Sequence, residues 1–162
     1  MLRFRLSELK QRYALGERHF SDIDLSGLDL SGLNLEDVNF LGVNLQGANL
    51  QGTHLQRANL KDVNLADSNL YRTNLYRAKL NDTNLRKSNL EEAICHYAFI
   101  DNTDLDYACL KRTDFSEAYL RNVSVKGTQI NKTDFTDSTL IDVNLSQAHV
   151  IEIYYSSNCS PQ

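Results

Sequence analysis

Residues 63–85 read VNLADSNLYRTNLYRAKLNDTNL and carry a leucine at every fifth position, from Leu65 to Leu85. In an α-helix, which turns about 100° per residue, a step of five rotates the side chain by roughly 140°, so successive leucines would point all round the axis. In a β-strand, side chains alternate, so an odd step places successive leucines on opposite faces. The remaining way to point every fifth residue inward is a chain that coils around these residues. The spacing therefore predicts a solenoid.

The same spacing continues over most of the chain. Every fifth residue from Leu25 to Val150 is apolar, with Cys95 counted among them. Two residues before each of these central positions stands a small or aliphatic residue, such as Val63 or Thr73. We expect both positions to point inward, where small residues fill the space between leucines, and the other three to face outward.

The outward positions carry the residues of tight turns. The residue before the central one is most often Asn or Asp, whose side chains can bond to nearby backbone and can stack in ladders. Six of the seven glycines lie two residues after a central position, where we expect a corner with positive φ. These glycines are Gly27, Gly32, Gly42, Gly47, Gly52 and Gly127.

Units such as ADSNL, YRTNL, QRANL and KDVNL resemble the pentapeptide repeat family, in particular its small cyanobacterial-type members. The resemblance covers residues 20–153 without a break in register. It implies an all-β fold, a right-handed quadrilateral parallel β-helix, with four repeats in each coil. The sequence departs from the family pattern where other residues replace Asn or Asp: Ile94, Phe99, Cys109, Tyr119 and Ser124.

The two ends differ from the repeats, and we expect them to cover the ends of the solenoid. Residues 1–19 are predicted to form an N-terminal capping segment with a helix over residues 7–15. Ser7 is its expected N-cap, and Gly16 stands where it should stop. Its apolar residues fall near one face: Leu6, Leu9 and Tyr13. The repeats should end in a last strand near residue 153, and residues 154–162 are predicted to be a frayed C-terminal tail.

Composition limits the class of protein. The chain has 162 residues, 41% of them hydrophobic, a mean hydropathy of -0.44 and a formal net charge of -4. These values fit one domain and not a membrane protein, and the sequence shows neither a signal-peptide core nor a membrane-spanning stretch. The cysteines, Cys95, Cys109 and Cys159, are odd in number and widely spaced, which favours reduced thiols and a cytoplasmic location.

The sequence predicts no catalytic, metal or cofactor site. The four histidines are far apart, and none has a cysteine or a second histidine at metal-ligand spacing. Cys95 and His96 are adjacent, as a nucleophile and its base could be, but Cys95 occupies a central inward position and His96 an outward one. We interpret Cys95 as a core residue and expect that the protein is not an enzyme.

A protein-interaction scaffold is the function that the pattern favours, with an unidentified protein partner and a monomeric or weakly dimeric state. The resemblance implies one alternative, since some pentapeptide repeat proteins imitate duplex DNA with an acidic rod and bind DNA gyrase. In this chain, residues 57–87 carry a formal charge of +4 and interrupt two acidic segments, 17–56 and 88–117, of -5 each.

A second alternative is weak nucleic-acid binding through a basic and aromatic belt. The belt consists of Arg57, Tyr71, Arg72, Tyr76 and Arg77. In a coil of 20 residues, Arg57, Arg77, Tyr97 and Glu117 would stack in one outer column. The opposing interpretation, which we favour, is that such residues form cation–π and charge ladders between coils.

The candidate partner surface lies where apolar residues replace the outward Asn or Asp. Ile94, Phe99 and Tyr119 are such residues, and four repeats separate Phe99 from Tyr119. We expect these two rings to touch on one face, with Ile94 on the adjacent face. Charged residues would rim the patch: Lys79, Asp101 and Arg121. Exposed apolar clusters with a charged rim are typical of interaction sites.

Overall fold

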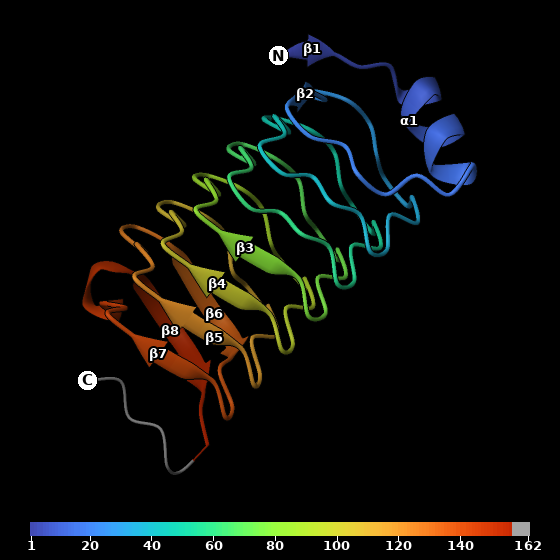
Figure 1. Cartoon of the computed structure of the whole chain (residues 1–162). Helices are drawn as coiled ribbons and strands as arrows, with labels where there is room; N and C mark the ends of the chain where they lie inside the picture. Colours follow the sequence, from blue (N-terminus) through green and yellow to red (C-terminus); the bar gives the residue numbers. More distant parts are fainter. Residues whose placement is uncertain (157–162) are drawn as a thin grey trace.

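The computed structural model describes residues 1–156 and shows a parallel β-helix with a short helix at its N-terminal end (Figure 1). Parallel bridges join residues that are 20 apart, as in the series Asn44, Asn64 and Asn84. Four five-residue repeats therefore make one coil, and the predicted solenoid is confirmed. Figure 1 shows the coils stacked into a rod that runs from the N-terminal to the C-terminal end.

The interior contains the residues that the spacing predicts. Leu45, Leu65 and Leu75 are fully buried, and so are the residues two places before each of them, Val43, Val63 and Thr73, at 1% exposure or less. Inner threonines satisfy their hydroxyl groups by donating to a carbonyl of the preceding coil, for example Thr73 Oγ1 to the Leu50 oxygen at 2.7 Å. Buried polar groups are tolerated when they are hydrogen-bonded in this way.

Each repeat ends in a tight turn. In the turn after Leu75, the Ala78 N–H donates to the Leu75 carbonyl at 2.9 Å, and Arg77 has a φ of 57°. A positive φ at the third residue is typical of a type II turn. The six predicted corner glycines have φ between 62° and 67°, which confirms their role. The same conformation also occurs where the sequence has larger residues, for example at Tyr97 with a φ of 57°.

Strands of three or more residues occur toward the C-terminal half. Four of them form one parallel sheet in the order β3 (Lys79–Asn81), β4 (Phe99–Asp101), β5 (Tyr119–Arg121) and β7 (Thr139–Ile141). The opposite wall of the rod carries β6 (Gln129–Asp134) and β8 (His149–Tyr154), also parallel. A short 3-10 helix, η1 (Leu145–Gln147), precedes β8.

Each of these six strands begins at a repeat position where Asn or Asp is absent. Where Asn is present, its side-chain oxygen accepts the N–H two residues on, as Asn59 does from Lys61 at 3.3 Å. Asp101 stands two residues after Phe99, and the Phe99 side chain cannot accept its N–H. Asp101 instead pairs with Asn81 and Arg121 on the neighbouring coils. An Asx turn takes up the N–H that a longer strand would use.

The N-terminal segment covers the first coil. β1 (Leu2–Arg3) pairs with β2 (Ile23–Asp24), and α1 (Leu6–Ala14) follows β1. Leu9 is fully buried, and Leu6 and Tyr13 pack against the core, which confirms the predicted apolar face. Gly16 follows the helix with a φ of 92°. The prediction for Ser7 was wrong: α1 starts earlier, its N-cap is Arg5 and no side chain caps it.

The C-terminal end departs from the predicted inward pattern at one position. Val150 is 45% exposed, although the spacing places it inside. It lies in β8, the last strand that the structure describes, where no later described coil covers it, and β6 and β8 shift register between Ile130 and Thr133. The predicted frayed tail lies mostly outside the described residues, as does Cys159. Within residues 1–156, no helix is both long and apolar enough to cross a membrane.

Candidate interaction surface

The three residues of the predicted partner surface lie on two adjacent faces of the rod. Phe99 begins β4 and Tyr119 begins β5, and the strand register pairs them directly. Their rings are stacked, with centroids 4.9 Å apart and planes 3° apart, so the expected contact is present. Ile94 lies on the neighbouring face, where it bridges Asn74 and Asp114. Ile94 and Phe99 are 41% and 39% exposed.

Between these two faces, the corner of the rod carries further rings. Tyr97 is 39% exposed, and its ring centroid lies 4.1 Å from His96 and 6.0 Å from Tyr76. The Arg77 guanidinium carbon lies 5.1 Å from the Tyr76 ring centroid and 5.4 Å from that of Tyr97. Tyr76, Arg77, His96 and Tyr97 form what we call the corner cluster.

The corner cluster joins the separate parts of the predicted surface. Residues 94–99 run from Ile94 through His96 and Tyr97 to Phe99, so apolar and aromatic side chains follow one another around the corner. We call Ile94, the corner cluster, Phe99 and Tyr119 together the aromatic ridge. The 20-residue spacing predicts Arg77 beside Tyr97, but the predicted partner surface includes neither Tyr97 nor His96. The signal was available in their 20-residue spacing from Tyr76 and Arg77.

Polar contacts fix the orientation of the corner cluster. His96 Nδ1 lies 2.7 Å from Ser116 Oγ, and the Ser116 hydroxyl in turn contacts the Asp114 carboxylate. A hydrogen bond to the Glu117 carboxylate, with partial burial, raises the pKa of the Tyr97 phenol. These contacts hold the two rings against Tyr76 and limit the entropy that a partner would have to remove.

His96 makes these contacts away from Cys95. Cys95 is 1% exposed, and burial together with the nearby Asp114 raises the pKa of its thiol. A buried thiol of high pKa is a poor nucleophile. The geometry therefore agrees with the core role predicted for Cys95. Among residues 1–156, no three His, Cys, Asp or Glu side chains are grouped so as to hold a metal ion.

The belt proposed for nucleic-acid binding is divided between two corners, and carboxylates occupy part of it. Arg57 donates to Asp37 through two bonds of 2.8 Å, and Arg72 Nε donates to Glu92 at 2.6 Å. Tyr71 stands with Arg72 at one corner, whereas Tyr76 and Arg77 stand at the next. Of the three belt arginines, only Arg77 has no ion-pair partner within the described chain. These contacts are the inter-coil ladders expected as the opposing interpretation.

The predicted charged rim is partly neutralised. Arg121 makes two hydrogen bonds to Asp101 on the neighbouring coil, at 2.8 and 2.5 Å. This contact lowers the pKa of the Asp101 carboxyl. Lys79 stands in register with Phe99 and forms no ion pair among residues 1–156. The uncompensated positive charge at the ridge therefore lies on the side of Arg77 and Lys79.

Several solved structures of pentapeptide repeat proteins resemble this chain. HetL, from the cyanobacterium Nostoc sp. strain PCC 7120, is 18% identical, with 96% of this chain and 99% of HetL covered and a TM-score of 0.31. Rfr23, from the cyanobacterium Cyanothece 51142, is 21% identical over 95% and 97%, with a TM-score of 0.30. QnrB1, a plasmid-mediated fluoroquinolone resistance protein, is 13% identical over 86% and 84%, with a TM-score of 0.32. No curated protein sequence matches the chain.

The repeats themselves match a family model described as pentapeptide repeats, in 8 copies. The matched segments are residues 19–57, 44–82, 58–94, 68–106 and 100–137. They overlap into a continuous stretch that includes more than half of the sequence. The chain therefore belongs to the pentapeptide repeat family.

Proposed function

We propose that this protein is a non-enzymatic scaffold that binds a protein partner through the aromatic ridge. The observation that carries the proposal is the position of the ridge residues. Ile94, Phe99 and Tyr119 occupy the outward position before the central residue, which holds Asn or Asp in most repeats. The coils pair in parallel at these positions as they do where the polar residue is present. Exposed aromatic residues with little freedom to move are the usual anchors of protein interfaces.

The charge around the ridge specifies one property of the partner. Arg77 in the ridge and Lys79 beside it have no carboxylate partner in the described chain, whereas Asp101 is already bound by Arg121. A partner would therefore place an acidic group next to Arg77 and Lys79 and apolar side chains over Phe99 and Tyr97. The ridge has fewer residues than one side of a standard interface, so the partner should also cover neighbouring coils.

The test removes the rings and keeps the coil. The triple variant Tyr97→Asn, Phe99→Asn and Tyr119→Asn gives positions 99 and 119 the residue that is common at their place in the repeat. At position 97, which is a turn position, Asn tolerates the positive φ. The matched control is Tyr107→Asn, because Tyr107 is 47% exposed and has a φ of 60° on a corner two repeats away. We expect the triple variant to recover at least tenfold less of a specific partner from the host's lysate.

The readout is quantitative mass spectrometry of proteins retained by the immobilised chain, after thermal unfolding has shown that each variant is folded. The control should retain the partner at the unsubstituted level. Equal recovery by the triple variant and the unsubstituted chain would contradict the ridge as the docking surface. In that case the belt around Arg72 and Arg77 is the next surface to test.

A further inference from the structure

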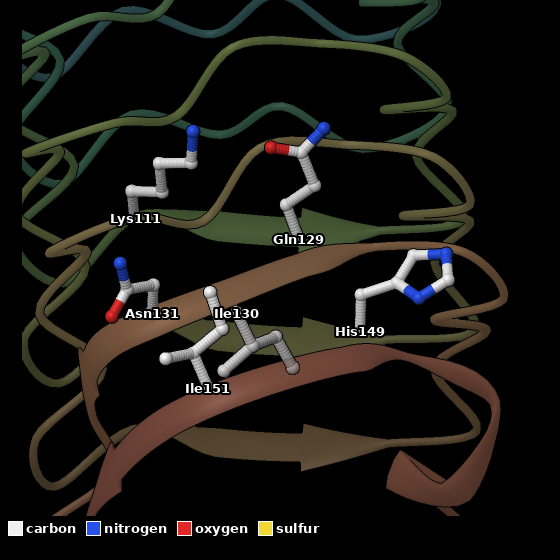
Figure 2. Close-up of a pocket in the computed structure, with 6 residues that line it drawn as sticks. All are labelled: Lys111, Gln129, Ile130, Asn131, His149 and Ile151. Carbon is white, nitrogen blue, oxygen red and sulfur yellow. The ribbon is translucent and has the colours of Figure 1, made fainter.

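A depression of about 320 Å³ lies on the rod wall opposite the Phe99–Tyr119 pair, over β6 and β8 (Figure 2). The residues that line it are Lys111, Gln129, Ile130, Asn131, His149 and Ile151. Figure 2 shows Lys111, Asn131 and Ile151 on one side, Gln129 and His149 on the other, and Ile130 between them. Ligand sites start at about this volume, which is enough for one small organic molecule.

The depression forms where the ladder of hydrogen-bonded Asn side chains on this wall ends. Higher on the same wall, Asn69 donates to Asn49 at 3.0 Å and accepts the Tyr71 N–H at 3.2 Å, so its amide is used within the protein. Farther down the column, Gln129 and His149 replace Asn. β6 and β8 also shift register just after Gln129 and His149, between Ile130 and Asn131. The wall therefore changes from a closed ladder to an open surface.

The polar side chains that line the depression have no partners within the described chain. The side chains of Lys111, Gln129, Asn131 and His149 form no hydrogen bond or ion pair to any of residues 1–156. The adjacent Arg112 differs, because it is held by Glu91 and Glu92 at 2.5 and 2.7 Å. Among residues 1–156, no carboxylate lines the depression. The Lys111 ammonium therefore stands at its edge without a counter-ion from the described part of the chain.

The remaining side of the depression is apolar. Ile151 is 79% exposed and stands beside Lys111 and Asn131 in the view of Figure 2. An ammonium group and two carboxamides favour oxygen acceptors with negative charge, and an exposed isoleucine favours contact with a hydrocarbon group. We propose that this depression binds a small organic anion, with a carboxylate or phosphate monoester near Lys111 and a compact apolar body against Ile151.

The proposal is tested by nuclear magnetic resonance on the full ¹⁵N-labelled chain, with the side-chain amide signals of Gln129 and Asn131 as reporters. The probes are sodium benzoate, phenyl phosphate, benzyl alcohol and inorganic phosphate. We expect benzoate or phenyl phosphate to shift both amide signals in a saturable manner, and the tighter of the two identifies the preferred oxyanion. Benzyl alcohol, which has the ring without the charge, should produce no saturable shift.

The decisive variant is Lys111→Met, which keeps the aliphatic chain and removes the charge. It should weaken binding of the anionic probe at least tenfold. Lys132→Met is the matched control, because Lys132 is exposed on the next coil and does not line the depression. Four results would overturn the proposal: no saturable shift with either benzoate or phenyl phosphate at about 20 mM, a saturable shift with benzyl alcohol, unchanged affinity in Lys111→Met, or inorganic phosphate that binds as tightly as phenyl phosphate.

Discussion

Residues 39–89 and residues 94–129 form coils of the same backbone geometry but carry different outward side chains. In the first region, the Asn64 N–H donates to the Val43 carbonyl at 3.1 Å; in the second, the N–H groups of Ile94 and Cys109 make the equivalent bonds at 3.0 Å. The backbone contact between coils is therefore independent of the outward side chain. The inward residues and the turns determine the fold, and the outward residue before each central position is free to vary.

The two regions differ in what the outward column adds. In the first region, Asn49, Asn69 and Asn89 form a ladder of side-chain hydrogen bonds, with Asn69 bonded to both neighbours at 3.0 and 3.3 Å. In the second region, Cys109 ends this ladder, and Phe99 and Tyr119 stack their rings instead. The first arrangement gives stability without a distinctive surface, and the second presents groups that a partner can recognise.

The largest effect should follow from an interior charge in either region. Leu75 and Leu105 are 0% and 1% exposed, so Leu75→Asp and Leu105→Asp would each bury a carboxylate without a partner. We expect each substitution to lower the free energy of unfolding by several kcal/mol, or about 3 to 5, measured by chemical denaturation. Gln51→Asp, on an exposed turn, is the control. A variant of one region that unfolds like the parent would show that the interior is not equivalent in the two regions.

Loss of a ladder amide should cost less. Asn69→Ala removes three side-chain bonds: it leaves the Asn49 and Asn89 amides with one partner fewer, and it leaves the Tyr71 N–H without its turn acceptor. We expect a loss of about 1 to 3 kcal/mol in the free energy of unfolding. Cys109→Ala, in the same column, is the comparison and should lose less than Asn69→Ala. Equal losses at the two positions would mean that the ladder adds no stability.

Extending the ladder should have a smaller effect of the opposite sign. Cys109 bridges Asn89 on the preceding coil, so Cys109→Asn would place an amide beside that of Asn89. We expect the free energy of unfolding to rise by about 0.5 to 1.5 kcal/mol. Cys109→Ser, which cannot reach as far, separates the ladder from the loss of the thiol. A gain of the same size in Cys109→Ser would contradict the ladder as its cause.

The sequence was sufficient to predict the interior, because a five-residue spacing of apolar residues has one structural solution. It also placed Phe99 against Tyr119, since residues 20 apart meet on adjacent coils. The corner cluster was incompletely predicted because His96 and Tyr97 stand at turn positions, where the repeat pattern tolerates any residue. Val150 was misplaced because the five-residue spacing does not show whether another described coil covers a given inward position. The depression over β6 and β8 depends on a register shift that the repeat pattern does not predict.

The ion pair next to the ridge should produce a modest dependence of stability on pH. The Arg121 guanidinium lowers the pKa of Asp101 below its ordinary value in the unfolded chain, about 3.9. Its stabilising effect is therefore complete above that value and is lost as the pH falls through the folded-state pKa. We expect the melting temperature of Asp101→Asn to fall less between pH 5 and about pH 2 than that of the parent. Asp67→Asn is the control, because Asp67 has no ion-pair partner within residues 1–156; identical curves for the parent and Asp101→Asn would contradict this contribution.

The smallest expected effect is on DNA gyrase, the target suggested by the alternative of DNA mimicry. Mimicry requires a continuous array of free negative charge, whereas carboxylates at several places along the rod are held by arginines one coil away. Asp37 is bound by Arg57 at 2.8 Å, Glu92 by Arg72 at 2.6 Å and Asp106 by Arg86 at 2.8 Å. Such pairs cancel the field that would replace that of the phosphates. We therefore expect no inhibition in a gyrase supercoiling assay at concentrations where acidic members of the family act. Inhibition there would favour the DNA-mimic function over the ridge scaffold. It would mean that gyrase recognises the shape of the rod even though its carboxylates are paired.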